Sequence, residues 1–163
     1  MDEKLVGYVI GVIDSEGSFS VSVKLQKTTA YGVRLDPVFS ITQAERVVLE
    51  TVRQVVGVGR IRKKPGQKHL WLYIVDSYPD LQVLITFLDA HIGLLIAKRR
   101  SYEVFREIVS MLIAGGHKTL EGLIEVLKLV DSLSKLNPKS RRRRDLDLII
   151  TLLRTGREPP GDR

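Results

Sequence analysis

The sequence contains no cysteine, and its three histidines, His69, His91 and His117, are scattered along the chain. Zinc fingers and nucleases that bind their metal through histidine need several such ligands together, so both classes are excluded. The N-terminus lacks the pattern of a signal peptide, and no apolar run reaches the roughly 18 residues of a membrane span. We therefore expect no membrane partner and an intracellular, cytoplasmic protein, with an organellar location left open.

Positive charge is in excess, because 26 Lys and Arg face 19 Asp and Glu and give a net charge of +7. A basic chain suits a polyanionic partner such as nucleic acid, although a soluble basic protein without such a partner has the same composition. The 163 residues are enough for one domain with a sizeable core. We expect this domain to cover residues 1–155, followed by a flexible C-terminal tail at 156–163.

The segment from Val9 to Gly17 reads V-I-G-V-I-D-S-E-G and joins an apolar stretch to two acids. A helix that begins near Asp2 or Glu3 is apolar almost all round here, which predicts burial. Gly7 and Gly11 lie four residues apart on one face of that helix. Each glycine costs roughly 0.5–1 kcal/mol relative to alanine, and close approach of another backbone would offset this loss.

Asp14, Ser15 and Glu16 fall at the C-terminal end of the predicted helix, where the helix dipole disfavours anions. A cation would relieve this arrangement, and carboxylate and backbone carbonyl oxygens suit Mg²⁺ or Ca²⁺. The alternative is a buried helix that ends in a solvated turn, with Gly17 as a left-handed cap. The residues alone leave both interpretations open.

Four downstream segments, at 18–28, 33–42, 59–64 and 70–75, alternate apolar and polar residues as half-buried strands do. The first two form a hairpin, in which Pro37 indicates an edge or a bulge. The fourth strand is expected to direct Leu70, Leu72 and Ile74 to the core and His69, Trp71 and Tyr73 to the polar face. One polar face is an ordinary wet surface, but four in series favour a β-ribbon that reads the DNA major groove. Trp71 and Tyr73 either stack on bases or complete a local cluster.

Helical periodicity predicts helices at 45–56, 76–90, 98–113, 119–136 and 145–153. The loop before the last of them, 137–144, reads N-P-K-S-R-R-R-R. Such a run is commonly a solvated charge run, but binding of DNA phosphates is the interpretation we favour here.

The segment V-I-G-V-I-D-S-E-G resembles the motif of the LAGLIDADG homing endonucleases and matches it at Gly11, Ile13, Asp14 and Gly17. The order of elements over roughly residues 5–110 is also similar to that of the family. Glu16 stands where the eponymous motif has Asp, which keeps the charge but adds a methylene. The resemblance implies an α/β (α+β) fold with an αββαββα core, a saddle-shaped antiparallel sheet and additional C-terminal helices.

The resemblance further implies a site-specific endonuclease that cuts both strands of DNA, is intron-encoded and acts in intron homing. The target would be long and pseudo-palindromic, and hydrolysis would leave 3′ overhangs. Mg²⁺ is the expected cofactor; Mn²⁺ is expected to substitute, and Ca²⁺ to bind without supporting cleavage. The competing interpretation is a non-cleaving binder of the same fold, either an intron RNA maturase or a transcription regulator, which leaves intron RNA open as a further partner. A structural basic protein is a third interpretation.

The chain holds one acid-bearing motif, so the resemblance implies a homodimer that pairs through Gly7, Ile10, Gly11 and Asp14. It assigns catalysis to Glu16, Gln43 and Lys98, and metal binding to Glu16 and Ser15. Asp14 is expected to hold the end of the opposing helix by hydrogen bonds, with metal binding as its second role. Gln43 equally fits a helix cap, Lys98 a surface lysine, and Arg46 is a weaker candidate for the same pocket. The expected DNA-binding residues are Ser20, Ser22, Lys24, Gln26, Arg34, Asp36, Ser40, Arg60, Arg62, Lys64, Trp71, Lys139, Arg141 and Arg142.

Overall fold

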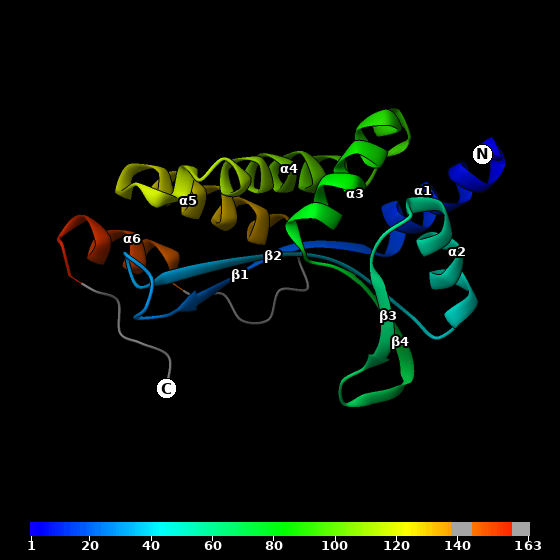
Figure 1. The fold of residues 1–163 in the computed structure, drawn as a ribbon, viewed down its shortest axis with the longest axis horizontal. Helices are drawn as coiled ribbons and strands as arrows, with labels where there is room; N and C mark the ends of the chain where they lie inside the picture. The colour runs from blue at the N-terminus through cyan, green and yellow to red at the C-terminus, as the bar shows by residue number, and fades with distance from the viewer. Residues whose placement is uncertain (138–144, 158–163) are drawn as a thin grey trace. The chain divides into compact units, whose positions relative to one another are not determined.

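Helices and one four-stranded sheet make up the fold of the computed structural model, which describes residues 1–137 and 145–157 (Figure 1). The strands are β1 (Gly17–Leu25), β2 (Val33–Gln43), β3 (Arg60–Lys64) and β4 (Gln67–Val75), in the order β1-β2-β4-β3. The helices are α1 (Glu3–Glu16), α2 (Arg46–Val56), α3 (Tyr78–Ala90), α4 (Arg99–Ile113), α5 (Leu120–Leu136) and α6 (Leu146–Arg154), with 3-10 turns η1 (Ile92–Leu94) and η2 (Gly116–Lys118). The predicted αββαββα order and the C-terminal helices are confirmed.

The contacts between Cα atoms divide the chain into two compact units. The first comprises Met1–Phe19 and Val38–Tyr102, and the second comprises Ser20–Pro37 and Glu103–Arg163. Residues 138–144 and 158–163 of the second unit lie outside the described part of the chain. None of the described helices combines the length and the apolar character that crossing a membrane requires.

The motif helix α1 begins where the sequence predicted, because Asp2 caps it: the Lys4 backbone N–H donates to Asp2 Oδ1 at 2.9 Å. One side of the helix is buried, and it packs beside α2 within the first unit. Ile10 is only 1% exposed, so it lies in the core of its own chain, contrary to its predicted place in a dimer interface. Gly7 and Gly11 are exposed, which leaves one face of the helix uncovered instead of the burial predicted all round.

Gly17 ends α1 in an extended conformation, with φ −67° and ψ 144°. The left-handed cap considered from the sequence is therefore not formed. Glycine is required for a different reason, because a Cβ at this position would clash with the Ile13 carbonyl oxygen and lie 3.0 Å from Phe39 Cε2. Because Gly17 has no Cβ, the chain can pass directly from the motif helix into β1 while Phe39 packs against it.

The strand registers assign the side chains of the sheet to two faces, since residues directly opposite in an antiparallel pair point to the same side. Trp71 of β4 pairs with Gln43 of β2 on one side and with Lys63 of β3 on the other. By the same registers the core face holds Phe39, Ile41, Gln43, Ile61, Lys63, Trp71, Tyr73 and Val75. The other face, which we call the open face, holds Ser40, Thr42, Arg60, Arg62, Leu72 and Ile74, of which Ile74 is nevertheless buried.

The sequence therefore predicted the wrong face for Trp71 and Tyr73 of β4, although Ile74 is buried as expected. Tyr73 is fully buried and its hydroxyl donates to the Val58 carbonyl at 2.7 Å, so it does not stack on a base. Trp71 shares this core face and lies on the opposite side of the sheet from Arg60 and Arg62. Alternation in the sequence separates two sets of side chains correctly, but it does not say which set the helices cover.

Two irregularities interrupt the sheet. A register shift lies between Lys63 and Lys64, and it removes Lys64 from the alternation that the sequence suggested for β3. Pro37 lies in β2, an inner strand, and not on an edge strand. The pairing of β2 with β4 begins at Phe39, so the missing N–H of Pro37 falls outside that ladder.

In the second unit, α5 contacts η2 and packs against α6, and both α5 and α6 bury apolar side chains. Thr119 caps α5 by accepting from the Gly122 N–H at 3.1 Å, and Asp145 caps α6 by accepting from the Leu148 N–H at 3.0 Å. Both helices occur where the sequence predicted them. Their buried residues are Leu123, Ile124, Val126, Leu127, Val130, Leu133, Leu146, Ile149, Ile150 and Leu153.

Candidate functional site

The end of α1 is tied to the start of α4 through the carboxylate of Asp14. Its Oδ1 accepts from the backbone N–H of Ile96 at 2.9 Å and of Lys98 at 2.8 Å. Its Oδ2 accepts from the Ala97 N–H at 3.0 Å. A negative charge at the C-terminal end of a helix is unfavourable, and here three backbone N–H dipoles compensate the charge of Asp14. The sequence predicted hydrogen bonds from Asp14 to an opposing helix, whereas these bonds lie within its own chain.

Glu16, the last residue of α1, is exposed, while the Ser15 hydroxyl turns back into the helix and donates to the Gly11 carbonyl at 2.9 Å. Ser15 therefore offers a metal its backbone carbonyl and not its hydroxyl. Within residues 1–137 and 145–157, no group of three or more His, Cys, Asp or Glu side chains is arranged to bind a metal. One chain contributes at most part of a metal site at this helix end.

The other two predicted catalytic residues belong to the first unit as well. Lys98 directly precedes α4, and its backbone is held by Asp14. Gln43 is the last residue of β2 and is half-buried. It does not cap the next helix, because the N-cap of α2 is Glu45, which makes no side-chain capping bond. The alternative role for Gln43 is therefore wrong.

Trp71 lies beside Gln43 and is surrounded by cations. The Arg46 guanidinium carbon lies 4.7 Å from the centroid of the Trp71 ring, and Lys63 Nζ lies 3.8 Å from it. Arg46 Nε also contacts Glu50 Oε1 at 2.7 Å. Sequence analysis missed Lys63, because it grouped Trp71 with Arg60 and Arg62 on one polar face, whereas the pairing of β3 with β4 places Trp71 on the face of Lys63.

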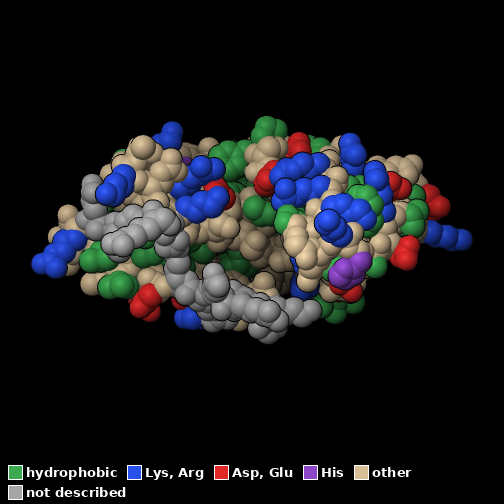
Figure 2. Space-filling model, turned by 90° about the horizontal axis from the view of Figure 1, so that it is seen from below, with side chains coloured by type: hydrophobic (Ala, Val, Ile, Leu, Met, Phe, Trp, Pro, Cys, Tyr) green, Lys and Arg blue, Asp and Glu red, His purple; other side chains and the backbone are tan. Residues whose placement is uncertain are grey.

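The open face of the sheet carries the remaining candidates of the first unit, Ser40, Arg60 and Arg62. Asp76 binds Arg60 through two contacts, Nη1 to Oδ1 at 2.6 Å and Nη2 to Oδ2 at 2.9 Å. The hydrogen bonds from Arg60 hold the pKa of Asp76 below its ordinary value. Figure 2 shows Lys and Arg side chains gathered around the β3–β4 hairpin, as a polyanion-binding surface requires.

In the second unit, the described candidates lie on β1, directly after it at Gln26, and on β2, and two of them contact Asp36. Lys24 Nζ lies 2.8 Å from Asp36 Oδ2, and Arg34 Nε lies 2.8 Å from Asp36 Oδ1. Partial burial alone would raise the pKa of Asp36, but the hydrogen bonds from Lys24 and Arg34 outweigh it and lower the pKa. Gln26 donates to Thr28 Oγ1 at 2.7 Å. Ser22 is exposed and Ser20 half-buried, while Lys139, Arg141 and Arg142 lie outside the described residues.

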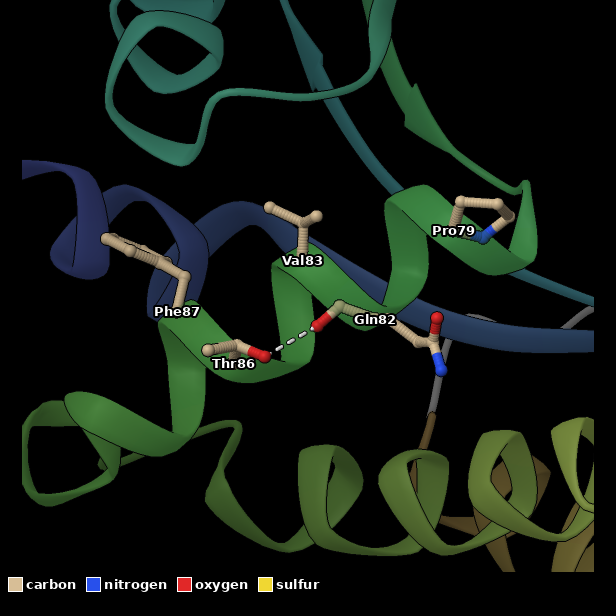
Figure 3. A pocket seen from close by; sticks show the side chains of 5 residues that line it. All are labelled: Pro79, Gln82, Val83, Thr86 and Phe87. Atoms are coloured by element: carbon tan, nitrogen blue, oxygen red, sulfur yellow. Dashed lines mark hydrogen bonds between the residues drawn. The ribbon is translucent and has the colours of Figure 1, made fainter.

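A shallow groove on α3 is a competing candidate for a binding site. Pro79, Gln82, Val83, Thr86 and Phe87 line it, and all of them belong to α3 (Figure 3). The Thr86 hydroxyl donates to the Gln82 carbonyl at 2.9 Å, so it is used within the helix. The lining includes no titratable group, so the groove offers none of the general acid–base or metal chemistry of hydrolysis.

The carboxylates at the end of α1, the basic open face and the order of elements are those of a known group of enzymes. Residues 9–109 match the family model described as LAGLIDADG endonuclease. The homing endonuclease I-ApeII of Aeropyrum pernix is 44% identical over 169 residues, which cover 100% of both chains. The chain therefore belongs to the LAGLIDADG endonuclease family.

Solved structures agree with this assignment. An archaeal intron-encoded homing endonuclease, I-Vdi141I complexed with DNA, is 42% identical with a TM-score of 0.90, and the match covers 94% of this chain and 98% of that one. The homing endonuclease I-TnaI is 28% identical with a TM-score of 0.79 and coverage of 94% and 99%. Within its family, the chain is a homing endonuclease, a nuclease that acts at a specific site.

Proposed function

We propose that this homing endonuclease works as a homodimer that uses Mg²⁺ to cut both strands of a long, pseudo-palindromic DNA target and leaves 3′ overhangs. The observation that carries the proposal is the position of Glu16. It is exposed at the end of a motif helix, and the described residues of its own chain contain no group of three or more His, Cys, Asp or Glu side chains that could hold a metal.

The uncovered face of α1 supports the homodimer. A Cβ at Gly7 or Gly11 would meet nothing within 4 Å in the single chain, so nothing inside the chain offsets the cost of these glycines. Apolar side chains surround the same end of the molecule: Leu94 is 51% exposed and Ile96 is 85% exposed, directly beside the backbone that Asp14 binds. An isologous pairing of two α1 helices would cover both the glycines and these side chains.

The donor set at the helix end fits a hard divalent cation. Glu16 supplies a carboxylate, Ser15 a backbone carbonyl, and a second copy would supply the same pair, which makes an all-oxygen site. Asp14 has both oxygens occupied by backbone donors, which favours a positioning role over metal binding. When bound, Mg²⁺ supplies positive charge that lowers the pKa of a water and stabilises the leaving 3′ oxygen.

The remaining residues would act on the DNA and on water. Lys98, fixed by Asp14, would neutralise charge on the scissile phosphate, and Gln43 would orient water beside it. Ser40, Arg60 and Arg62 on the open face, with Ser20, Ser22, Lys24, Gln26, Arg34 and Asp36 in the second unit, would contact bases and backbone. The DNA complex of I-Vdi141I, at 42% identity, supports this assignment.

The test replaces Glu16 with Gln, which keeps the shape of the side chain and removes its charge. The target is first obtained by incubating the protein with a plasmid library and Mg²⁺ and sequencing the cut ends. We expect Glu16→Gln to abolish cleavage while target affinity is retained. Glu3→Gln, at the exposed opposite end of α1, is the matched control and should cut normally. Full cleavage by Glu16→Gln would refute the assignment, and a wild-type protein that binds without cutting would favour a maturase or a regulator.

A further inference from the structure

Trp71 occupies an unusual position for an aromatic residue of a DNA-binding sheet. It lies on the core face, opposite the face that carries Ser40, Arg60 and Arg62. Its neighbours across the two adjacent strands are Gln43 and Lys63. Trp71 therefore stands next to a candidate catalytic residue and away from the residues that would read bases.

Two cations approach the Trp71 ring from different elements. Lys63 comes from β3, with Nζ 3.8 Å from the ring centroid. Arg46 is the first residue of α2, which follows β2 on the other side of β4, and its guanidinium carbon lies 4.7 Å from the centroid. Both distances are within the range of cation–π attraction. A DNA base that stacked on a face of the ring held by either cation would have to displace that cation.

The two cations are suited to binding phosphate. Arg46 lies at the N-terminus of α2, where the helix dipole also favours an anion. Its contact with Glu50 uses Nε, and a guanidinium has four further N–H donors on its terminal nitrogens. Arg46 and Lys63 are both exposed, so a phosphate can reach them while the ring limits their rotamers.

We propose that Trp71 is a positioning residue that acts through Arg46 and Lys63. It holds the two side chains over its ring, so that both are oriented towards DNA backbone phosphates next to Gln43 before the DNA binds. This assignment rests on the proposed function, because it concerns how the enzyme engages its substrate. It replaces the role of Trp71 in base stacking that the sequence suggested.

The first test uses the fact that Trp71 is the only tryptophan of the chain. Its fluorescence in the wild-type protein therefore reports on this ring alone. We expect target DNA, added without divalent metal, to leave the emission nearly unchanged, because the cations stay on the ring. Strong quenching of the emission by DNA would indicate base stacking and overturn the proposal.

The second test measures the salt dependence of target affinity for Trp71→Leu. Each lost phosphate contact lowers the slope of log K against log salt by about 0.9. Leucine and tryptophan are both uncharged, so a decrease of about one to two in the slope would mean that Arg46, Lys63 or both no longer engage phosphate. Loss of affinity at an unchanged slope would contradict the proposal, since it is the result expected for a purely structural or stacking role.

Single-turnover cleavage provides the third measurement. We expect Trp71→Leu to slow cleavage about two- to fivefold, the factor that corresponds to one exposed cation–π contact. Trp71→Phe, which keeps an aromatic face, should recover most of the rate and of the salt slope. In the background Arg46→Ala with Lys63→Ala, Trp71→Leu should have little further effect. An undiminished effect in that background would overturn the proposal.

Tyr78→Leu, which replaces an exposed aromatic residue at the start of α3, is the matched control and should change neither the rate nor the slope. The outcomes separate the two proposals. If the wild-type protein does not cut DNA, the proposed function fails, and the fluorescence and the salt slope still test Trp71 in DNA binding. If the wild-type protein cuts but Trp71→Phe restores nothing, only the role of Trp71 is wrong.

Discussion

The carboxylate of Asp14 binds the backbone N–H of Lys98 at 2.8 Å, across 84 positions of the chain. This contact joins the end of the motif helix to the start of α4, and with the amides of Ile96 and Ala97 it gives both carboxylate oxygens a backbone donor. The two acids of the motif thus have different surroundings. Asp14 organises the chain, whereas Glu16 remains exposed for chemistry.

Asp14→Asn is expected to destabilise the protein. Three backbone N–H groups donate to the two oxygens of the Asp14 carboxylate, whereas an amide has only one oxygen to accept them. The nitrogen of the amide would face a backbone N–H, with a cost of about 1–2 kcal/mol. Urea unfolding would measure this loss, and cleavage should fall as Lys98 loses its fixed position. Asp2→Asn is the matched control, since Asn caps a helix as well as Asp does. Equal stability of the two variants would contradict this account of Asp14.

Gly11→Leu is expected to block association of two chains without unfolding either one. The added side chain meets open space in the single chain but would occupy the surface proposed for the partner. Sedimentation of the wild-type protein should show a dimer, and sedimentation of the variant a monomer that no longer cuts both strands. Gln54→Leu adds the same side chain to an exposed position of α2 and should leave the dimer intact. A dimeric Gly11→Leu protein would show that the α1 face is not the interface.

Gly17→Ala is expected to destabilise the fold by about 1–3 kcal/mol, the usual cost of overpacking. The new methyl group would clash with the Ile13 carbonyl oxygen, a backbone atom that cannot move without distorting α1. Gly7→Ala is the control: no atom lies within 4 Å of its Cβ, so the single chain should be unchanged or slightly more stable. Thermal unfolding, at a protein concentration too low for dimers to form, compares the stabilities of the two variants. A Gly17→Ala protein as stable as the wild type would be inconsistent with the observed end of α1.

Asp76→Asn should cost less than about 1 kcal/mol of stability at neutral pH, because its contact with Arg60 is partly exposed. The pKa of Asp76 is lower in the folded protein than its ordinary value of 3.8, so this contribution is present above that pH and is lost as the pH falls through the folded pKa. The stability difference between wild type and variant should therefore be constant from about pH 7 to 5 and shrink below about pH 4. Urea unfolding across this range is the measurement, and a difference that grows on acidification would reverse the assigned sign.

The sequence by itself determined the elements and their order. Asp2 predicted the start of α1, helical periodicity predicted a helix at 45–56 where α2 is found, and alternation predicted four strands close to their observed bounds. These features depend on a residue and its near neighbours, through capping, backbone conformation and periodic side-chain direction. The motif is likewise one continuous segment of the sequence, and its resemblance to a known family was sufficient to predict the class of enzyme.

Only the tertiary structure decided which face of each strand is covered and which partner each polar group has. The hydrogen bond of the buried Tyr73 to Val58, the pairing of β3 with β4 that places Lys63 opposite Trp71, and the three amides on Asp14 all depend on contacts between residues that are not neighbours in the sequence. Alternation is symmetric with respect to the two sides of a strand, and a carboxylate does not indicate in the sequence which amide it will meet. These choices depend on how the elements pack, since packing determines which groups lose water and which neighbours replace it.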